Sequence, residues 1–136
     1  MAQFHFHWGS DSQGGSEHLI DGERHFAEIH LVHYKDEYGT IGHSLDHDDG
    51  LGVLGFFVDV DATAAEGPLD ELIQTKISTN LVKLDASKEI SFSIEDMITV
   101  TNIDNYYRYI IRVLPARTDP RLKCTFVCLF HNNLSF

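Results

Sequence analysis

The stretch QFHFHW, residues 3–8, alternates between polar and aromatic side chains, and this alternation constrains the fold more than any other feature of the chain. Successive side chains of a β-strand point to opposite faces of the sheet. Gln3, His5 and His7 would therefore share one face, and the three aromatic residues between them would share the other. The stretch predicts a strand that packs an aromatic layer on one side and presents two imidazoles on the other.

A second alternating run, FAEIHLVHY, occupies residues 26–34. If it pairs antiparallel with the first strand, His30 can lie beside His5 and His7 on one face of the sheet. Three neutral imidazoles are a typical catalytic zinc set, with the fourth coordination position open. The His-x-His pair alone is equally compatible with two incidental histidines on a polar face. The second run favours a metal site.

Two further polar residues lie on the same faces as the candidate ligands. Gln3 and Glu28 each come two residues before a ligand, His5 and His30 respectively. Metal-bound histidines usually donate their other ring N–H to a carboxylate or carbonyl oxygen, so both residues are candidate acceptors. His33 falls on the opposite face, where we expect a packing or polar role and no zinc binding.

The rest of the chain predicts a mainly β fold with short helices, an α+β class. In addition to the two strands above, strands are expected at 51–60 and 89–93. A helix is expected at 68–77, with Pro68 in its first turn, and a helical turn at 93–98. A turn-rich link is expected at 11–16, and a charged loop at 35–49 contains the acidic stretch DHDD.

Composition sets limits on partners and location. The 136 residues predict one domain, and 43% hydrophobic residues suffice for a core. A net charge of −11 argues against nucleic acid and anionic membrane surfaces as partners. No apolar run approaches the roughly 20 residues that span a membrane, and no secretory leader precedes the first strand. A cytoplasmic location is the default expectation, although a full-length parent protein could be secreted.

Residues 3–18 and 26–34 together resemble a known protein family. QFHFHWGSDSQGGSEH followed by FAEIHLVHY resembles the zinc-binding core of the α-carbonic anhydrases, including the 22 residues between His7 and His30. GLGVLGFFVDV (50–60) resembles the next core strand of that family, and NIDNYYRY (102–109) resembles the segment before its active-site loop. The resemblance implies a central, twisted, mostly antiparallel sheet of the α-carbonic anhydrase type, here incomplete.

The resemblance also implies roles for individual residues. His5, His7 and His30 would bind Zn²⁺, with Gln3 orienting His5 and Glu28 orienting His30.

Other residues of the family pattern surround that site. Glu17 would be a buried catalytic acid that accepts a hydrogen bond from a threonine hydroxyl. Val32 and Val53 would line the apolar wall where carbon dioxide rests, and Tyr109 would belong to the active-site hydrogen-bond network. His18 corresponds to a structural histidine that helps to hold the fold.

The implied activity is that of a lyase, the reversible hydration of carbon dioxide to bicarbonate and a proton. Zinc lowers the pKa of a bound water to about 7, which supplies a nucleophile at neutral pH. The partner would be this small-molecule substrate.

The likeness ends at Tyr109, so we expect a partial α-carbonic anhydrase domain at 1–109 and a divergent tail of unknown structure at 110–136. The tail lacks the family's Thr-Thr pair; its nearest threonine, Thr118, stands in a different context. The family's N-terminal portion, with its proton-shuttle histidine, is also not matched. The chain could be a fragment, from a partial or mis-spliced product, or a natural short variant. Surface positions are expected for His25, His43, His47 and His131, and free thiols for Cys124 and Cys128.

Three functions therefore stay open. The chain could be an active carbonic anhydrase, a non-catalytic zinc-binding relative that has lost the threonine gate, or an incomplete chain with little or no activity because the gate and the shuttle region are missing.

Overall fold

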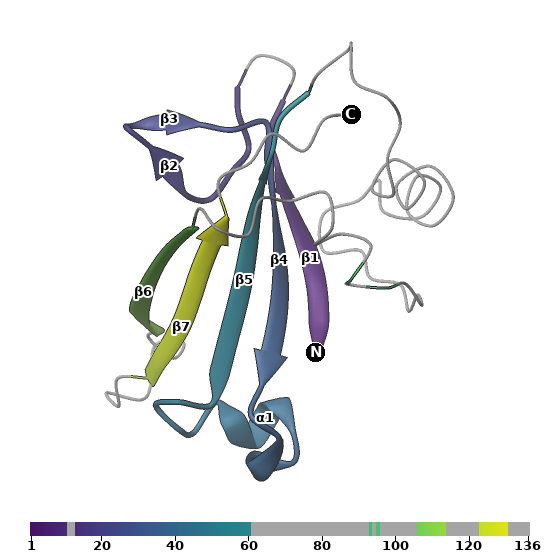
Figure 1. Cartoon of the computed structure of the whole chain (residues 1–136), viewed down its shortest axis with the longest axis vertical. Coiled ribbons are helices and arrows are strands. Elements are labelled where there is room, and N and C mark those ends of the chain that lie inside the picture. Colours follow the sequence, from purple (N-terminus) through teal and green to yellow (C-terminus); the bar gives the residue numbers. More distant parts are fainter. Residues whose placement is uncertain (11–12, 61–92, 94, 96–105, 114–122, 131–136) are drawn as a thin grey trace.

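A five-stranded sheet forms the body of the protein (Figure 1). The computed structural model describes residues 1–10, 13–60, 93, 95, 106–113 and 123–130, and of residues 111–113 and 123–130 it describes the backbone. The strands follow one another across the sheet in the order β1 (Gln3–Trp8), β4 (Ala27–Tyr34), β5 (Leu51–Val58), β7 (Lys123–Phe130) and β6 (Tyr106–Val113).

The sheet confirms the predicted mainly β, mostly antiparallel architecture. β1 pairs antiparallel with β4, β4 with β5, and β6 with β7, whereas β5 and β7 run parallel. The strands expected at 3–8, 26–34 and 51–60 are all present, the last two slightly shorter than predicted. β6 and β7 were not predicted as strands, and β6 crosses the boundary expected between residues 109 and 110.

The register between β1 and β4 decides which side chains meet. His5 lies directly opposite His30, and His7 lies opposite Glu28. On the other side of β4, His30 faces Gly55 of β5. Opposed residues share a face of the sheet, and a slip of one residue would turn every side chain to the other face. The observed register therefore gathers His5, His7, Glu28 and His30 on one face.

The opposite face of the sheet holds most of the apolar core. Ile29 and Leu31 are fully buried there, and Phe56 and Val58 are each 1% exposed. Burial of side chains of this size contributes about 1.5–3 kcal/mol each. β4 therefore contributes to both faces of the sheet, because Ile29 and Leu31 enter the core while Glu28 and His30 face the other way.

The segment between β4 and β5 corrects one expectation. Instead of a plain loop at 35–49, it contains the 3₁₀ helix η1 (Asp36–Tyr38) and the short helix α1 (Ile41–Ser44). Thr40 begins α1, because its side-chain oxygen accepts a hydrogen bond of 3.2 Å from the backbone N–H of His43. His43 is exposed, as predicted.

A small hairpin, β2 (Leu19–Ile20) and β3 (Glu23–Arg24), lies beside one end of the sheet (Figure 1). Asp21 and Gly22 form its turn with φ values of 53° and 87°, the backbone that an Asp-Gly pair favours in tight hairpins. This hairpin was not predicted from the sequence. It follows directly on Glu17 and His18, so it helps to place both residues near β4.

Several expected features lie outside the described residues. These are the helix at 68–77, the strand at 89–93, most of the helical turn at 93–98, and residues His131 and Thr118. Among the residues that the structure describes, no helix is long and apolar enough to cross a membrane.

Candidate metal centre

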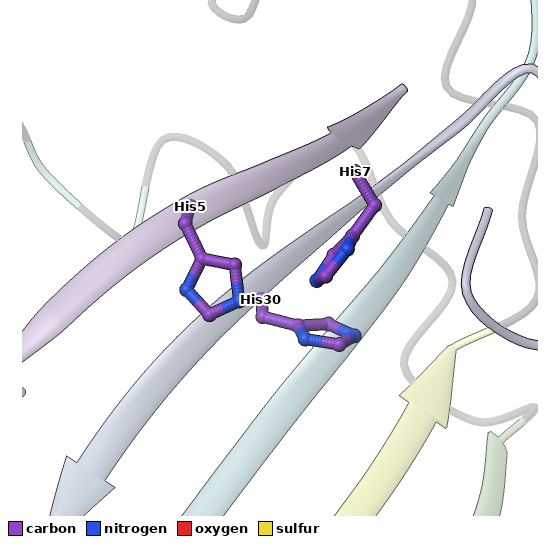
Figure 2. Close-up of side chains that lie close together, drawn as sticks. All are labelled: His5, His7 and His30. Atoms are coloured by element: carbon purple, nitrogen blue, oxygen red, sulfur yellow. The ribbon is translucent and has the colours of Figure 1, made fainter. Parts of the chain in front are cut away.

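Three histidine side chains converge on one face of the sheet, two from β1 and one from β4 (Figure 2). The ring centroids lie 5.0 Å apart for His5 and His7, 5.2 Å for His5 and His30, and 4.6 Å for His7 and His30. One ring nitrogen from each residue lies within 4.8 Å of those of the other two. His5 and His7 are half-buried and His30 is buried, so this cluster is partly shielded from solvent.

The electrostatics of the cluster favour neutral imidazoles. Burial, followed by the neighbouring charge of His30, lowers the pKa of His5 and of His7 below the usual value of 6.5. Neutral imidazole is the form that binds metal. At neutral pH these two ligands are therefore ready to bind without first losing a proton.

One buried atom tests whether the residues fit a metal ion. Nε2 of His7 is buried and has no hydrogen-bond partner among the residues that the structure describes. A buried polar atom left unpaired costs about 1–3 kcal/mol. A cation held between the three rings would satisfy this nitrogen, and a set of three histidines is a ligand set that zinc prefers. The residues present therefore fit a zinc ion.

Glu28 orients the ring of His30 through a hydrogen bond. Its side chain is fully buried, and Oε1 lies 2.5 Å from Nε2 of His30. Burial raises the pKa of the Glu28 carboxyl, but hydrogen bonds from His30 and from the backbone and ring of His18 outweigh burial and lower that pKa to about 2. The ionised carboxylate holds the proton of His30 on Nε2, which leaves the lone pair of Nδ1 available to a metal ion.

His18 extends this contact away from the cluster. Its backbone N–H donates to Oε2 of Glu28 at 2.8 Å, and its Nδ1 lies 2.6 Å from Oε1. Its other ring nitrogen, Nε2, is hydrogen-bonded to the hydroxyl of Tyr109. Since Nδ1–H donates to the carboxylate, Nε2 accepts from the Tyr109 hydroxyl. Burial, with the charges of Glu28 and Glu17, raises the pKa of Tyr109 to about 12, so this hydroxyl keeps its proton.

Glu17 lies beside the cluster but not in the predicted environment. Its Oε2 is 3.8 Å from Nε2 of His7 and 3.8 Å from Nδ1 of His30. The sequence predicted a buried acid, yet the Glu17 side chain is 57% exposed. The prediction of burial is wrong for a physical reason: Glu17 precedes the β2–β3 hairpin, outside the sheet, and no threonine among the described residues covers it.

A second combination of possible ligands shares members with the first. Glu17, His18 and His30 also place one ligand atom each within 4.8 Å of one another. Both ring nitrogens of His18 are already engaged, by Glu28 and by Tyr109. The cluster of His5, His7 and His30 is therefore the better metal centre.

Gln3 is placed on the expected face but does not reach its expected partner. It lies opposite Val32 at the start of β1, where its side chain is exposed. Among the described residues it makes no hydrogen bond to His5. β1 is an edge strand of the described sheet, and its first residues have a neighbour on one side only.

Val32 and Val53 form an apolar surface next to the histidines. They lie directly opposite each other in β4 and β5, and each is two residues from the opposed pair His30 and Gly55. Val32 is 8% exposed, and Val53 packs against the buried ring of Phe57. The structure therefore places an apolar patch on the same face as the cluster.

His25 shows what sequence reasoning missed. It was expected on the surface, but it is half-buried, with its ring 4.3 Å from that of Phe57. Its Nδ1 lies 2.7 Å from a carboxylate oxygen of Asp59, just beyond β5. No local pattern joins residues this far apart in sequence.

Comparison with known proteins agrees with this geometry. Residues 1–110 match the model of the family described as eukaryotic-type carbonic anhydrase. Over 60 residues the chain is 47% identical to carbonic anhydrase 3 of Rattus norvegicus and of Mus musculus, and 45% identical to that of Sus scrofa. The matched segment covers 44% of this chain and 23% of each of these relatives. Since the family model covers most of the chain, the protein belongs to the eukaryotic-type carbonic anhydrase family.

Proposed function

We propose that this chain binds zinc through His5, His7 and His30 and uses it to hydrate carbon dioxide reversibly to bicarbonate and a proton. The observation that carries the proposal is the convergence of three histidine rings from β1 and β4 around the unpaired Nε2 of His7. Membership of the carbonic anhydrase family supports the same assignment.

Zinc held there would act as a Lewis acid and lower the pKa of a bound water to about 7. The chain's own residues prepare the site for this. Burial keeps His5 and His7 neutral, and the ionised Glu28 holds the proton of His30 away from the ligand atom. The three donor atoms are therefore set before any ion arrives, which reduces the reorganisation that binding requires.

The neighbouring side chains suit a small apolar substrate. Carbon dioxide carries no net charge, and the surface formed by Val32 and Val53 offers it contact without a competing hydrogen bond. Glu17, whose carboxylate lies 3.8 Å from ring nitrogens of His7 and His30, is placed to accept a hydrogen bond at the solvent side of the cluster. These positions support a site that admits carbon dioxide beside the three ligands.

The proposal is tested by a carbon dioxide hydration assay on the zinc-loaded full chain, with Val53→Asp as a probe of the apolar surface. We expect hydration by the parent chain and a large loss of rate in Val53→Asp with zinc still bound. Leu54→Asp would be a poor control, because the Leu54 side chain lies on the opposite face of the sheet from Val53. The control is Tyr107→Phe, at an exposed position. Absence of hydration by a chain that holds one zinc would contradict the proposal.

One observation favours a second function, that of a zinc-binding relative without turnover. Glu17 is exposed and contacts no threonine among the described residues, and the chain has no Thr-Thr pair after Tyr109. In that case the chain would bind zinc as tightly as an active carbonic anhydrase would, but it would not hydrate carbon dioxide. If instead the chain is too incomplete to assemble the site, zinc itself would be absent. The zinc content and the hydration rate, measured on one preparation, separate these outcomes.

A further inference from the structure

Strand β7 comes from the part of the chain beyond the family match, yet it lies inside the described sheet, between β5 and β6. The match ends at residue 110, and β7 covers Lys123–Phe130. β7 pairs in parallel with β5 on one side and antiparallel with β6 on the other. Figure 1 shows it between these two strands. β6 therefore joins the sheet through β7, with no direct pairing to β5.

The register of β7 fixes where Tyr109 lies. Val127 is opposite Val53 of β5 and also opposite Tyr109 of β6. Neighbouring strands lie about 4.8 Å apart, so β7 holds the backbone of Tyr109 roughly 9.6 Å from that of Val53. A slip of one residue between β6 and β7 would turn the Tyr109 side chain to the other face.

In this register Tyr109 reaches the metal centre. Its ring packs against Phe57 of β5, and its hydroxyl hydrogen-bonds Nε2 of His18, a residue 91 positions earlier in the chain. His18 in turn donates to Glu28. Glu28 holds the ring of His30. A continuous series of contacts thus joins β6 to one metal ligand.

We propose that β7, residues 123–130, is a positioning segment of the metal centre. By setting the distance and register of β6, it brings Tyr109 onto His18 and so restrains Glu28 and His30 for metal binding. The inference rests on the proposed function only in taking His30 as a metal ligand. It assigns the tail a role in this sheet, because among the described residues β6 pairs with β7 and with no strand of the family-matched part.

A positioning role differs from general support of the sheet in one measurable way. If β7 acts through Tyr109, then removing the Tyr109 hydroxyl and disrupting β7 must remove the same interaction. Their effects on zinc affinity would then not add, since residues in one network are coupled. If β7 only supports the fold, the two effects would be independent.

The test is a double-mutant cycle on the full chain, with the zinc Kd measured by competition against a chelator. Tyr109→Phe removes the hydroxyl, and Tyr107→Phe, at a position 58% exposed, is its control. Val127→Pro removes a backbone N–H from the middle of β7, where proline is not tolerated. Its control, Val127→Thr, keeps the N–H and the β-branched shape.

We expect Tyr109→Phe to weaken zinc binding about 10-fold, near the lower limit for residues that orient a metal ligand. Val127→Pro should weaken zinc binding to a similar extent, and the double variant should weaken it no further. Each of the two controls should change zinc affinity by less than about 2-fold. Amide hydrogen exchange of Val127→Pro should show loss of protection in β6 with protection kept in β1 and β4, which do not pair with β7.

Three results would overturn the inference: additive effects of the two substitutions, an unchanged Kd in Tyr109→Phe, or loss of protection across β1 and β4 in Val127→Pro. The last would show that β7 supports the whole sheet. Failure of the proposed function is recognised separately, because the parent chain would then bind zinc without hydrating carbon dioxide, or would bind no zinc at all.

Discussion

The two ends of the sheet contribute to the metal centre in different ways. β1, β4 and β5 come from the first 58 residues and carry all three histidines together with Glu28. β6 and β7 come from residues 106–130 and reach the site through one described side chain, Tyr109. The first region supplies the atoms that would hold a metal, and the second region adjusts how one of those atoms is held.

Metal binding and the positioning of a ligand therefore have different sequence requirements. The ligands need two adjacent alternating strands in register, which is a short-range condition. The contact between Tyr109 and His18 needs a register set across two further strands. Changes in the first region should therefore remove metal binding, whereas changes in the second should weaken it.

The largest effect is expected in the first region. His30→Ala should abolish tight zinc binding, because it removes a ligand from the centre of the cluster and leaves the Glu28 carboxylate without that partner. His33→Ala is the matched control: His33 is in the same strand but bonds the backbone oxygen of Leu31 at 3.1 Å. Zinc content after dialysis measures both. Equal retention of zinc by the two variants would sink the ligand assignment.

Phe57 lies where the two regions meet, so its removal should test how strongly they are joined. Its ring is 1% exposed and contacts Val53, Ile20 and Tyr109. Phe57→Ala should lower the free energy of unfolding by about 3–5 kcal/mol, through lost burial and the cavity left behind. The exposed Tyr107→Ala should change it by less than about 0.5 kcal/mol. Urea unfolding measures both, and a similar small loss in each would mean that the regions are not packed together.

Glu28 is the residue through which the second region acts on the first. Glu28→Gln keeps the shape of the side chain but removes its charge, so it should weaken zinc affinity by about 10–100-fold. Glu37→Gln, in the exposed helix η1, is the control and should leave affinity unchanged. The zinc Kd measures both variants. An affinity that does not change in Glu28→Gln would show that His30 is held by some other contact.

The stability of the metal-free protein should fall with decreasing pH in two stages. The pKa values of His5 and His7 are lowered from 6.5, so as the pH falls below 6.5 the unfolded state takes up protons first and stability is lost. The pKa of Glu28 is lowered from 4.5 to about 2, so its contribution is present above pH 4.5 and is lost as the pH falls toward 2. Unfolding measured across this range should show a smaller second stage in Glu28→Gln than in the parent. A parent curve that stays flat between pH 4.5 and 2 would contradict the account of Glu28.

Much of the first region could be predicted because its determinants are local. A period of two in residues 3–8 and 26–34 gave the strands, and the same period placed His5, His7 and His30 on one face. The pairing of Glu28 with His30 follows from the same rule, since both side chains point the same way from β4.

The strands of the second region could not be predicted, because their pairing depends on contacts between distant parts of the chain. The stretch that forms β7 reads from the sequence as a divergent tail, and its place between β5 and β6 depends on pairing across more than 60 residues. The exposure of Glu17 and the partial burial of His25 were missed for a similar reason: Glu17 precedes the β2–β3 hairpin, and His25 contacts Asp59, 34 positions later in the chain.

The central claim is that this chain assembles its three histidines into a metal centre. The most direct test is zinc stoichiometry on the purified monomer of the full chain after dialysis, with His30→Ala measured alongside. Our account predicts close to one zinc per parent chain and close to none in His30→Ala. A parent chain with close to zero zinc would contradict the account, because the ligands would then be present in the sequence without forming the site.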